Sequence, residues 1–506
     1  MKKLLFYSGI ITVLTACSEQ KHPNIVFILT DDMGYGDISF LGGDSCRLST
    51  PNLDRMAQEG AVFTDAHSSS SVSTPTRYGI LTGRYNWRST LKQGVLSGYS
   101  KALISQDRET MASMLKKQGY TTAGIGKWHL GWDWNNIDAG KNNIDFSKPV
   151  TNGPTTRGFD YFFGFCGSLD MPPYIYIEND KPTSVPNRET VNDGKYSWWR
   201  KGPTGSDFIH EEVLPNIIDR ACKYIREKSS SSQPYFLYLP LPAPHTPILP
   251  LEKYRDKSGL GEYGDFVLMV DDMVGKVLSA VKQSGEENNT IVVFTTDNGC
   301  SPAAGINELQ KQGHAPNGIF RGHKADLFDG GHRVPCIVRW PNRVKPHLIK
   351  QTVCLTDFYA TFADICDYSL SSTEGEDSYS LLPALESEKE ISPIREATVH
   401  HSIAGQFTIR KGKWKLLLSP SSGGWSFPKP GRDEEVIATL PAVQLYDMET
   451  DPRETTNLQA EHPEIVKTLR NLLKQYIIKG RSTPGEPQKN DEPEMWKQID
   501  WINNYQ

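Results

Sequence analysis

The sequence predicts an α/β protein with a mostly parallel central sheet, followed by a smaller C-terminal α+β part with an antiparallel sheet. Apolar, β-branched runs at residues 24–30, 235–239 and 290–296 each end in polar residues, as buried parallel strands do. From about residue 391 the pattern changes to short alternating runs separated by loops rich in glycine, proline and serine. A chain of 506 residues is long enough for two domains. We therefore expect a large domain over residues 23–390 and a small one over residues 391–506.

Helical patterns separate the apolar runs. A helix is predicted over residues 50–57, where Thr50 is followed by proline, a typical helix start. A second is predicted over residues 265–283. The small domain is expected to have short strands, a terminal amphipathic helix and a polar tail folded back on the surface. The strands are expected at residues 397–400, 406–410, 413–418 and from 445. The helix is expected at residues 463–479 and the tail at residues 489–506.

The first 17 residues are predicted to be a targeting segment. A basic start and an apolar run of signal-peptide length are followed by Leu-Thr-Ala-Cys, which resembles the lipobox of bacterial lipoproteins. That resemblance implies cleavage before Cys17 and acylation of its side chain. The alternative is an ordinary secretory signal with an incidental cysteine. Either one predicts export, and the lipobox predicts a lipid anchor on the periplasmic or cell-surface face of the outer membrane.

The composition argues against two kinds of site. A net charge of -5 argues against a general nucleic-acid-binding protein. The seven cysteines after Cys17 include no C-x-x-C pair, so a thiolate metal cluster is not expected. Membrane contact is expected only through the lipid anchor.

Oxygen ligands for a metal follow two of the apolar runs. Asp31 and Asp32 come directly after the first, and Asp297 and Asn298 after the third. Adjacent acids are usually solvated or cap a helix, so the pair alone is a weak signal. Because ligands gather at the carboxyl ends of parallel strands, these four side chains are expected to meet. Carboxylate and amide oxygens suit a hard divalent cation such as Ca²⁺.

A nucleophile beside a cation is predicted in residues 71–84. Ser73 is followed by Pro75 and Arg77, in the order Ser-x-Pro-x-Arg. Proline suits the first turn of a helix, because its missing N–H leaves no hydrogen bond unmade there. The free N–H groups of such a turn, together with Arg77, would bind an anion.

Two further segments carry basic side chains. Lys127 and His129 are two residues apart, so on an extended segment they would project to the same side. His245 lies between two prolines, as Pro-His-Thr-Pro, at the end of the second apolar run, and a histidine suits a general-acid task near neutral pH. Read singly, each of these residues is more often structural than functional.

The last block, residues 321–335, runs Arg-Gly-His-Lys and ends in Asp-Gly-Gly-His-Arg-Val-Pro. Arg333 and the paired glycines are expected to hold the turn. His323 and His332 are as readily structural as in contact with substrate, and His323 is retained as a weak substrate-binding candidate.

Together, these motifs resemble, in order, the signatures of the type I sulfatases, from residue 24 to about residue 458. The resemblance implies the alkaline-phosphatase-like α/β fold, a sulfatase catalytic domain over residues 23–390 and hydrolysis of sulfate esters. It implies oxidation of Ser73 to Cα-formylglycine by an anaerobic radical-SAM maturase, and a bound Ca²⁺ with Mg²⁺ as the alternative. It further implies that Lys127 and Lys324 contact sulfate, that His129 contacts formylglycine, and that His245 contacts the sulfate ester.

The expected substrate is a sulfated glycan. Residues 86–99 resemble the N-acetylgalactosamine-6-sulfatase-like branch, which implies 6-O-sulfated galactose or N-acetylgalactosamine of mucin or glycosaminoglycan. Trp87 and Arg88 in this stretch are weak substrate-binding candidates. Specificity is expected in loops outside the shared motifs, such as residues 166–206.

Three alternatives remain open at this point. One is a sulfatase for another position, namely 4-O or 3-O of a galacto sugar or 6-O of N-acetylglucosamine. Another is a phosphoesterase of the alkaline phosphatase superfamily, although Asn298, Lys127 and Lys324 stand where second-metal ligands would be expected. The third is a non-catalytic sugar-binding lipoprotein that keeps an unmodified Ser73.

Overall fold

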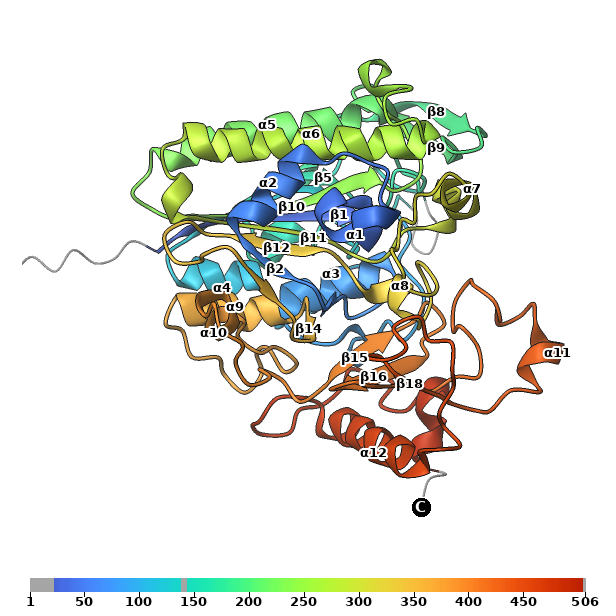
Figure 1. Cartoon of the computed structure of the whole chain (residues 1–506). Coiled ribbons are helices and arrows are strands. Elements are labelled where there is room, and N and C mark those ends of the chain that lie inside the picture. Colours follow the sequence, from blue (N-terminus) through green and yellow to red (C-terminus); the bar gives the residue numbers. More distant parts are fainter. Residues whose placement is uncertain (1–21, 138–142, 504–506) are drawn as a thin grey trace, which may run out of the picture.

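The computed structural model describes residues 22–137 and 143–503, and Figure 1 shows the chain as three layers with a small sheet below them. Within the described residues, the middle layer is a sheet of ten strands in the order β13-β2-β12-β11-β1-β10-β4-β5-β6-β7. In that order the strands are β13 (His347–Ile349), β2 (Ala61–Phe63), β12 (Cys336–Arg339), β11 (Thr290–Thr296), β1 (Asn24–Asp31), β10 (Tyr235–Pro244), β4 (Thr121–Lys127), β5 (Tyr161–Phe165), β6 (Ile177–Glu178) and β7 (Lys181–Pro182).

The centre of this sheet is parallel. β1 pairs in parallel with both β10 and β11, and the parallel order continues through β4 to β5. Antiparallel pairs appear only towards the two edges, as in β11 with β12 and β5 with β6. The predicted α/β fold with a mostly parallel sheet is therefore confirmed.

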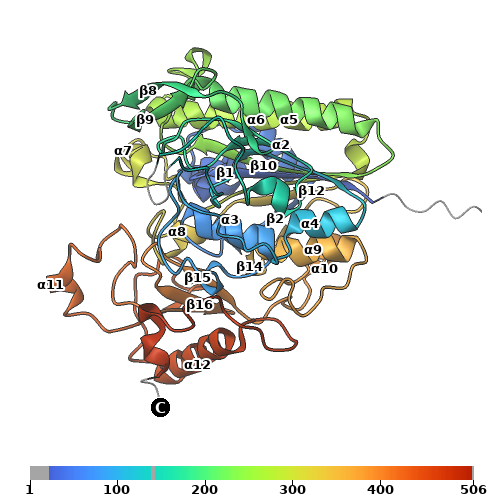
Figure 2. The same cartoon turned by 180° about the vertical axis from the view of Figure 1, so that it is seen from behind.

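Helices cover both faces of the sheet, because alternate residues of its buried strands point to opposite sides. Val26 and Ile28 of β1 pack in the core formed with α2 (Pro51–Glu59), α5 (Val213–Ser229) and α6 (Gly261–Gln283). Phe27 faces the opposite way and meets Phe358 edge to face at 5.2 Å. Figures 1 and 2 show the helical layer on this opposite face of the sheet. It is made of α3 (Ser73–Thr82), α4 (Met111–Lys117), α9 (Asp357–Ile365) and α10 (Leu382–Glu386).

The C-terminal part forms a four-stranded antiparallel sheet covered by a helix. Its strands are β15 (Thr398–His401), β16 (Phe407–Lys411), β17 (Trp414–Leu417) and β18 (Gln444–Asp447), and the helix is α12 (Pro463–Lys479). Apolar residues of the strands and of α12 share one core. The tail packs into this core through Trp496 and Ile499, which are 8% and 0% exposed, so it is more than the surface segment that was expected.

Shorter elements lie in the connections. Two further strand pairs are β3 (Ala66–His67) with β14 (Val353–Cys354), and β8 (Pro186–Asn192) with β9 (Trp199–Gly205). Four short helices are α1 (Ser39–Gly42), α7 (Ile306–Lys311), α8 (Asp329–His332) and α11 (Glu434–Ile437).

The predicted boundaries of helices and strands agree best with the structure where the hydrophobic periodicity of the sequence is clear. β11 and α12 have the predicted limits, whereas β10 runs five residues further than expected, to Pro244, and α6 begins four residues earlier. The predicted signal peptide and Cys17 lie outside the described residues. Among the residues that the structure does describe, no helix combines the length and apolar character needed to cross a bilayer.

Candidate active site

Four neighbouring strands deliver polar residues to one edge of the sheet. The β1–β11 register pairs Thr30 with Thr296, so the residues that follow, Asp31 and Asp297, lie side by side. The β1–β10 register shifts after Leu29 and pairs Asp31 with Pro244, which places His245 next to the acidic pair. Lys127 ends β4, the next strand along. Parallel pairing thus gathers residues that are more than 250 positions apart.

Ser73 is the first residue of α3. Val72 before it is extended, and Gly83 ends the helix with φ +61°, a left-handed conformation that glycine adopts at little cost. Arg77 lies one turn further along α3, so it faces Ser73. Its Nε donates to Ser73 Oγ at 2.7 Å and its Nη2 donates to Asp297 Oδ2 at 2.9 Å. α3 therefore fixes the nucleophile candidate to the acidic cluster through one guanidinium.

His129 approaches Ser73 from the loop after β4. Its Nδ1 lies 3.2 Å from Ser73 Oγ, and its Nε2 lies 2.8 Å from the Leu96 carbonyl oxygen. A carbonyl only accepts, so Nε2 carries the proton and Nδ1 accepts from Ser73 when the ring is neutral. Burial, reinforced by Lys127 and Arg77, holds the pKa of His129 well below its ordinary value. His129 is thus a neutral acceptor at the Ser73 oxygen.

Lys127 and His129 do not lie on one extended segment, contrary to the sequence prediction. β4 ends at Lys127, and His129 has φ +54°, so the segment is turned rather than extended. Lys127 reaches Asp31, while His129 reaches Ser73. Both side chains arrive at the site because the chain bends between them.

The acidic side chains are held by two lysines and an amide. Asp31 Oδ2 accepts from Lys127 Nζ at 2.5 Å. Asp32 accepts from Lys324 Nζ at 2.8 Å through Oδ2, and from Asn298 Nδ2 at 2.7 Å through Oδ1. His245 Nε2 lies 3.6 Å from Asp32 Oδ2. All four metal-ligand candidates are at most 2% exposed, so their charges interact strongly.

This charge balance sets the ionisation of the cluster. Burial alone would raise the pKa of Asp31, but Lys127, His245 and Arg77 together hold it below its ordinary value. Burial lowers the pKa of Lys127 despite Asp31. Burial would likewise lower the pKa of Lys324, but Asp32 and Asp31 outweigh it and raise that pKa.

Two buried oxygen atoms of the cluster lack a hydrogen-bond donor among residues 22–137 and 143–503. They are Asp31 Oδ1 and Asn298 Oδ1. Buried polar atoms without partners are rare, and a bound cation is one way to satisfy them. Three carboxylates and an amide oxygen form the donor set that hard divalent cations prefer. The residues present therefore fit the metal that the sequence predicts.

A cavity of about 440 Å³ opens onto Ser73. Ser73, His129, His245 and Lys324 form its floor. Its walls come from several segments, among them the loop after β5, the start of β9, residues 301–303 and the C-terminal part. These wall residues include Ser168, Asp170, Met171, Trp198, Arg200, Ile403 and Trp425.

The stretch that is expected to hold specificity, residues 166–206, contributes five residues to the lining of this cavity, and Trp425 is a further lining residue that the sequence did not predict. It lies in a stretch that the sequence predicts to be a connecting loop. Asp326 Oδ1 accepts from the Trp425 N–H at 2.7 Å, which ties this loop to the segment that carries Lys324. The one sequence feature that could have indicated a role for this loop is a tryptophan within a glycine-rich stretch.

Three weak substrate-binding candidates are placed elsewhere. Trp87 and Arg88 are 0% exposed, so the prediction that they bind substrate is wrong. Trp87 meets Phe407 edge to face at 5.3 Å, and Arg88 pairs with Asp377 through both Nε and Nη2. His323 lies outside the cavity lining, with its Nδ1 3.0 Å from the Lys324 carbonyl oxygen.

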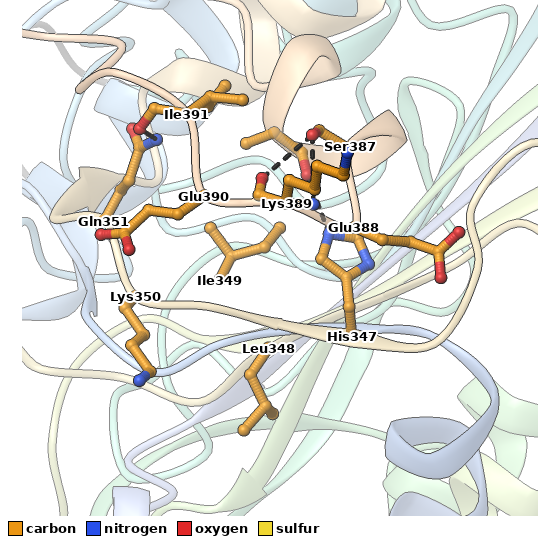
Figure 3. Close-up of a pocket in the computed structure, with 11 residues that line it drawn as sticks. His347, Leu348, Ile349, Lys350, Gln351, Ser387, Glu388, Lys389, Glu390 and Ile391 are labelled. Carbon is orange, nitrogen blue, oxygen red and sulfur yellow. Dashed lines mark hydrogen bonds between the residues drawn. The ribbon is translucent and has the colours of Figure 1, made fainter.

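A second hollow of about 190 Å³, shown in Figure 3, lies at the edge strand β13. Its rim combines lysine and glutamate side chains with apolar ones, and none of the predicted site residues lines it. It is lined by residues 347–351, Ala384 and residues 387–391. This hollow is therefore not the candidate active site.

Known proteins agree with this geometry. Residues 23–368 match the family described as Sulfatase. An N-acetylgalactosamine-6-O-sulfatase of Bacteroides thetaiotaomicron is 31% identical over 92% of this chain and 96% of its own length. An N-acetylgalactosamine-6-sulfatase of Rattus norvegicus is 28% identical over 94% and 89%, respectively. A structure from a study of glycosaminoglycan metabolism by B. thetaiotaomicron has a TM-score of 0.79 at 31% identity, covering 90% of this chain and 99% of that one.

The fold and the site define a hydrolase of the alkaline-phosphatase-like class. The chain belongs to the sulfatase family and is a sulfuric ester hydrolase, as the resemblance implied. A phosphonate monoester hydrolase of Agrobacterium radiobacter shares only the fold, with a TM-score of 0.59 at 17% identity.

Proposed function

We propose that this sulfatase is an exported, lipid-anchored enzyme that removes 6-O-sulfate from galactose or N-acetylgalactosamine at the ends of host glycans. The observation that carries the reaction is the convergence of Arg77 and His129 on the Ser73 oxygen, at 2.7 and 3.2 Å, on the floor of one cavity. The substrate rests on the named activity of the relatives, one of which is 31% identical over nearly the full length.

Maturation supplies the working nucleophile. Oxidation of the Ser73 alcohol to formylglycine removes the hydroxyl hydrogen and one Cβ hydrogen, and a radical-SAM maturase is the oxidant. A formylglycine hydrate offers two geminal hydroxyls, one to take the sulfuryl group from the sugar oxygen and one to release it as inorganic sulfate by C–O cleavage. Ser73 is 2% exposed in the folded chain, which supports modification before folding is complete.

The side chains around Ser73 have distinct roles in this proposal. Lys324 lines the cavity and Arg77 donates to Ser73 Oγ from below it, so both bring positive charge close to the proposed position of the sulfate. Positive charge preorganised in a buried site favours a transition state that accumulates negative charge. Lys127 holds Asp31 and contributes charge from behind. His129, neutral and with Nδ1 towards residue 73, accepts a hydroxyl proton there.

His245 is the proposed donor to the leaving sugar oxygen. Its Nδ1 faces the Thr246 carbonyl oxygen at 2.5 Å, which leaves Nε2 directed to the Asp32 side of the cavity. Asp31, Asp32, Asp297 and Asn298 would hold Ca²⁺, which supplies additional positive charge for the sulfate oxygens when it is bound.

The lipid anchor at Cys17 and export belong to the same proposal. Asn24, where β1 begins, lies seven positions after Cys17. An extended stretch of that length spans at most about 25 Å, so the body of the enzyme would stay near the membrane. The site residues follow the opposite end of β1, which supports an active site directed towards glycans outside the membrane.

The test is co-expression of the full chain with an anaerobic maturase, followed by peptide mass spectrometry and sulfate-release assays. We expect Ser73 to lose two hydrogen atoms and galactose 6-sulfate to release sulfate. Ser73→Ala should abolish release while leaving the fold intact. Faster hydrolysis of a matched phosphate ester would favour a phosphoesterase, and full activity of Ser73→Ala would overturn the mechanism.

A further inference from the structure

The stretch after α3, residues 86–99, meets the active site through its backbone. Leu96 presents its carbonyl oxygen to His129 Nε2 at 2.8 Å. Since a carbonyl oxygen only accepts, this contact keeps the ring hydrogen on Nε2 and leaves Nδ1 as the acceptor for residue 73. The position of one peptide carbonyl therefore matters to the base of the proposed reaction.

The side chain that follows the nucleophile fixes the position of Leu96. The Leu96 N–H donates to Thr74 Oγ1 at 3.2 Å. Thr74 is the second residue of α3 and is 0% exposed, so this hydroxyl has a defined place in the helix. Only two soft dihedral angles separate the N–H of a residue from its C=O, so holding the first restricts the direction of the second.

The loop around Leu96 is also held on both sides by bonds that do not involve α3. The Gly94 N–H donates to the Ile403 carbonyl oxygen at 2.8 Å. On the other side, Trp134 Nε1 donates to the Gly98 carbonyl oxygen at 2.9 Å. Loss of the Leu96 N–H bond alone should therefore shift one residue and leave the loop in place.

The contacts of Leu96 close a circuit around the candidate nucleophile. Ser73 and Thr74 are joined by a peptide bond, and Thr74 holds Leu96. Leu96 in turn holds His129, whose Nδ1 lies 3.2 Å from Ser73 Oγ. The His129 N–H donates to the Cys166 carbonyl oxygen at 2.7 Å, so the backbone of the histidine is fixed. What remains to be set is the tautomer of its ring.

Of the two ring contacts of His129, only the one to Leu96 selects a tautomer. A hydroxyl both donates and accepts, so Ser73 Oγ can bind Nδ1 with or without a hydrogen on that nitrogen. Protonation of both nitrogens is unfavourable, because burial, Lys127 and Arg77 hold the pKa of His129 well below its ordinary value. A neutral ring carries one N–H, and the Leu96 carbonyl oxygen keeps it on Nε2.

We propose that Thr74 is a positioning residue for this reaction. Through Leu96, it selects the tautomer of His129 that can accept a proton from the nucleophile. With the hydrogen on Nδ1, the neutral ring has no lone pair to offer at that position. Oxidation of Ser73 changes the atoms on its Cβ and leaves residue 74 unaltered, so Thr74 has the same part in the matured enzyme. The inference rests on the proposed function, in which His129 accepts that proton.

The experiment compares the full-length wild type with Thr74→Val and Thr74→Ser after co-expression with the maturase. Peptide mass spectrometry gives the formylglycine content of each preparation, and kcat is corrected for it. Valine keeps the branched shape but removes the acceptor, so kcat on galactose 6-sulfate should fall roughly 3- to 10-fold with KM nearly unchanged. Serine keeps the hydroxyl and should restore most of kcat.

Thr76→Val is the matched control for Thr74→Val. Thr76 also lies near the start of α3, is 0% exposed, and its Oγ1 donates to the Ser70 carbonyl oxygen at 2.8 Å. That carbonyl oxygen has a second donor in Ser68 Oγ at 2.6 Å, so it stays paired. The variant loses a buried threonine hydroxyl that does not bind Leu96, and it should keep the wild-type kcat.

A second readout needs neither maturation nor substrate. NMR of protein with unmodified Ser73 and ¹⁵N-labelled histidine distinguishes a ring nitrogen that carries hydrogen from one that does not. His129→Gln assigns the signals of His129. We expect the wild type to carry this hydrogen on Nε2 and Thr74→Val to show a mixture of both tautomers.

Three results would overturn the positioning role of Thr74. A wild-type kcat in Thr74→Val would do so, as would an unchanged His129 tautomer in that variant. A loss of kcat that Thr74→Ser does not relieve, or that Thr76→Val shares, would mark a purely structural role. Absence of sulfate release from all of the proteins would instead contradict the proposed function, and the NMR comparison would still show whether Thr74 sets the ring.

Discussion

Arg77 Nε donates to Ser73 Oγ at 2.7 Å, across one turn of α3. The same guanidinium donates through Nη2 to Asp297 and through Nη1 to the Lys127 carbonyl oxygen, at 2.9 and 3.3 Å. Asp297 and Asp31 outweigh the effect of burial and raise the pKa of Arg77 further, so the side chain is always charged. One residue therefore links the nucleophile, the acidic cluster and the end of β4.

Replacing Arg77 with lysine should lower kcat/KM by about 100-fold or more, a loss typical for one preorganised charged contact. Lysine keeps the charge but cannot reach Ser73 and Asp297 together with a planar fork. The measurement is sulfate release under saturating and limiting substrate.

Arg88→Lys is the matched control for this variant, because Arg88 is also a buried arginine with a bidentate acidic partner, Asp377. It should lower the melting temperature while leaving kcat/KM close to the wild-type value. A large catalytic loss in Arg88→Lys would contradict its placement outside the cavity.

Removal of the divalent cation should destabilise the protein as well as inactivate it. Asp31, Asp32 and Asp297 meet at one buried place, and a ligand that binds only the folded state adds stability by mass action. Treatment with a chelator should lower the melting temperature, and added Ca²⁺ should restore it. Asn298→Ala should weaken the response to Ca²⁺, since Asn298 Oδ1 has no other partner among the described residues. An unchanged melting curve after chelation would argue against a metal at this cluster.

The strand-end part of the site could be predicted from the sequence because parallel strands carry their last residues to one edge. Asp31 and Asp297 meet through a simple register, and both follow an apolar run that is easy to recognise. His245 depends on an irregularity in the β1–β10 register, which the sequence does not reveal. The motif order nevertheless placed it at the correct strand end.

Residues outside the strands were predictable only in part. Arg88 was a substrate-binding candidate, but its partner Asp377 is 289 positions away in the chain. No local sequence pattern indicates that contact. Asp170 lies in a loop that is expected to hold specificity, yet its partner is Arg200 from a different segment. Trp425 reaches the cavity from the C-terminal part, a long-range contact that periodicity cannot show.

The pH dependence of stability should show a titration of His314. Burial would lower the pKa of His314, and the Arg47 N–H, which donates to His314 Nδ1 at 3.2 Å, also opposes protonation. The Nε2 contact with Asp37 at 2.9 Å, together with Cys46, outweighs both and raises the pKa to about 9 from 6.5. A raised pKa means that protonated His314 stabilises the fold below about pH 6.5 and that this contribution disappears as the pH rises through 9. The free energy of unfolding should fall by up to about 3 kcal/mol over that range.

Urea denaturation between pH 6 and 9.5 measures this decline. His314→Gln should be less stable at pH 6.5 and should lack that part of the decline, whereas His462→Gln, at a side chain that is 39% exposed, should keep it. An identical decline in His314→Gln would assign the titration to another group.

The two sheets are joined by a buried ion cluster whose disruption should be strongly destabilising. Lys415 of β17 pairs with Asp329 at the start of α8 at 2.8 Å and with Glu454 at 2.7 Å, and all three side chains are 0% exposed. Lys415→Met leaves two buried carboxylates without their shared cation, which costs about 3–5 kcal/mol when a buried pair is broken. The urea midpoint should therefore fall sharply.

Adding Glu454→Gln to Lys415→Met should recover part of the loss, because it removes one of the two uncompensated charges and keeps an amide near the Asp329 N–H, which now donates to Glu454 at 2.7 Å. Lys413→Met is the matched control, since Lys413 lies two residues away and pairs with Asp447 at 2.6 Å through a side chain that is 41% exposed. Solvent already screens that pair, so its midpoint should stay close to the wild-type value. Equal effects of Lys415→Met and Lys413→Met would mean that the buried cluster does not hold the small sheet to the large one.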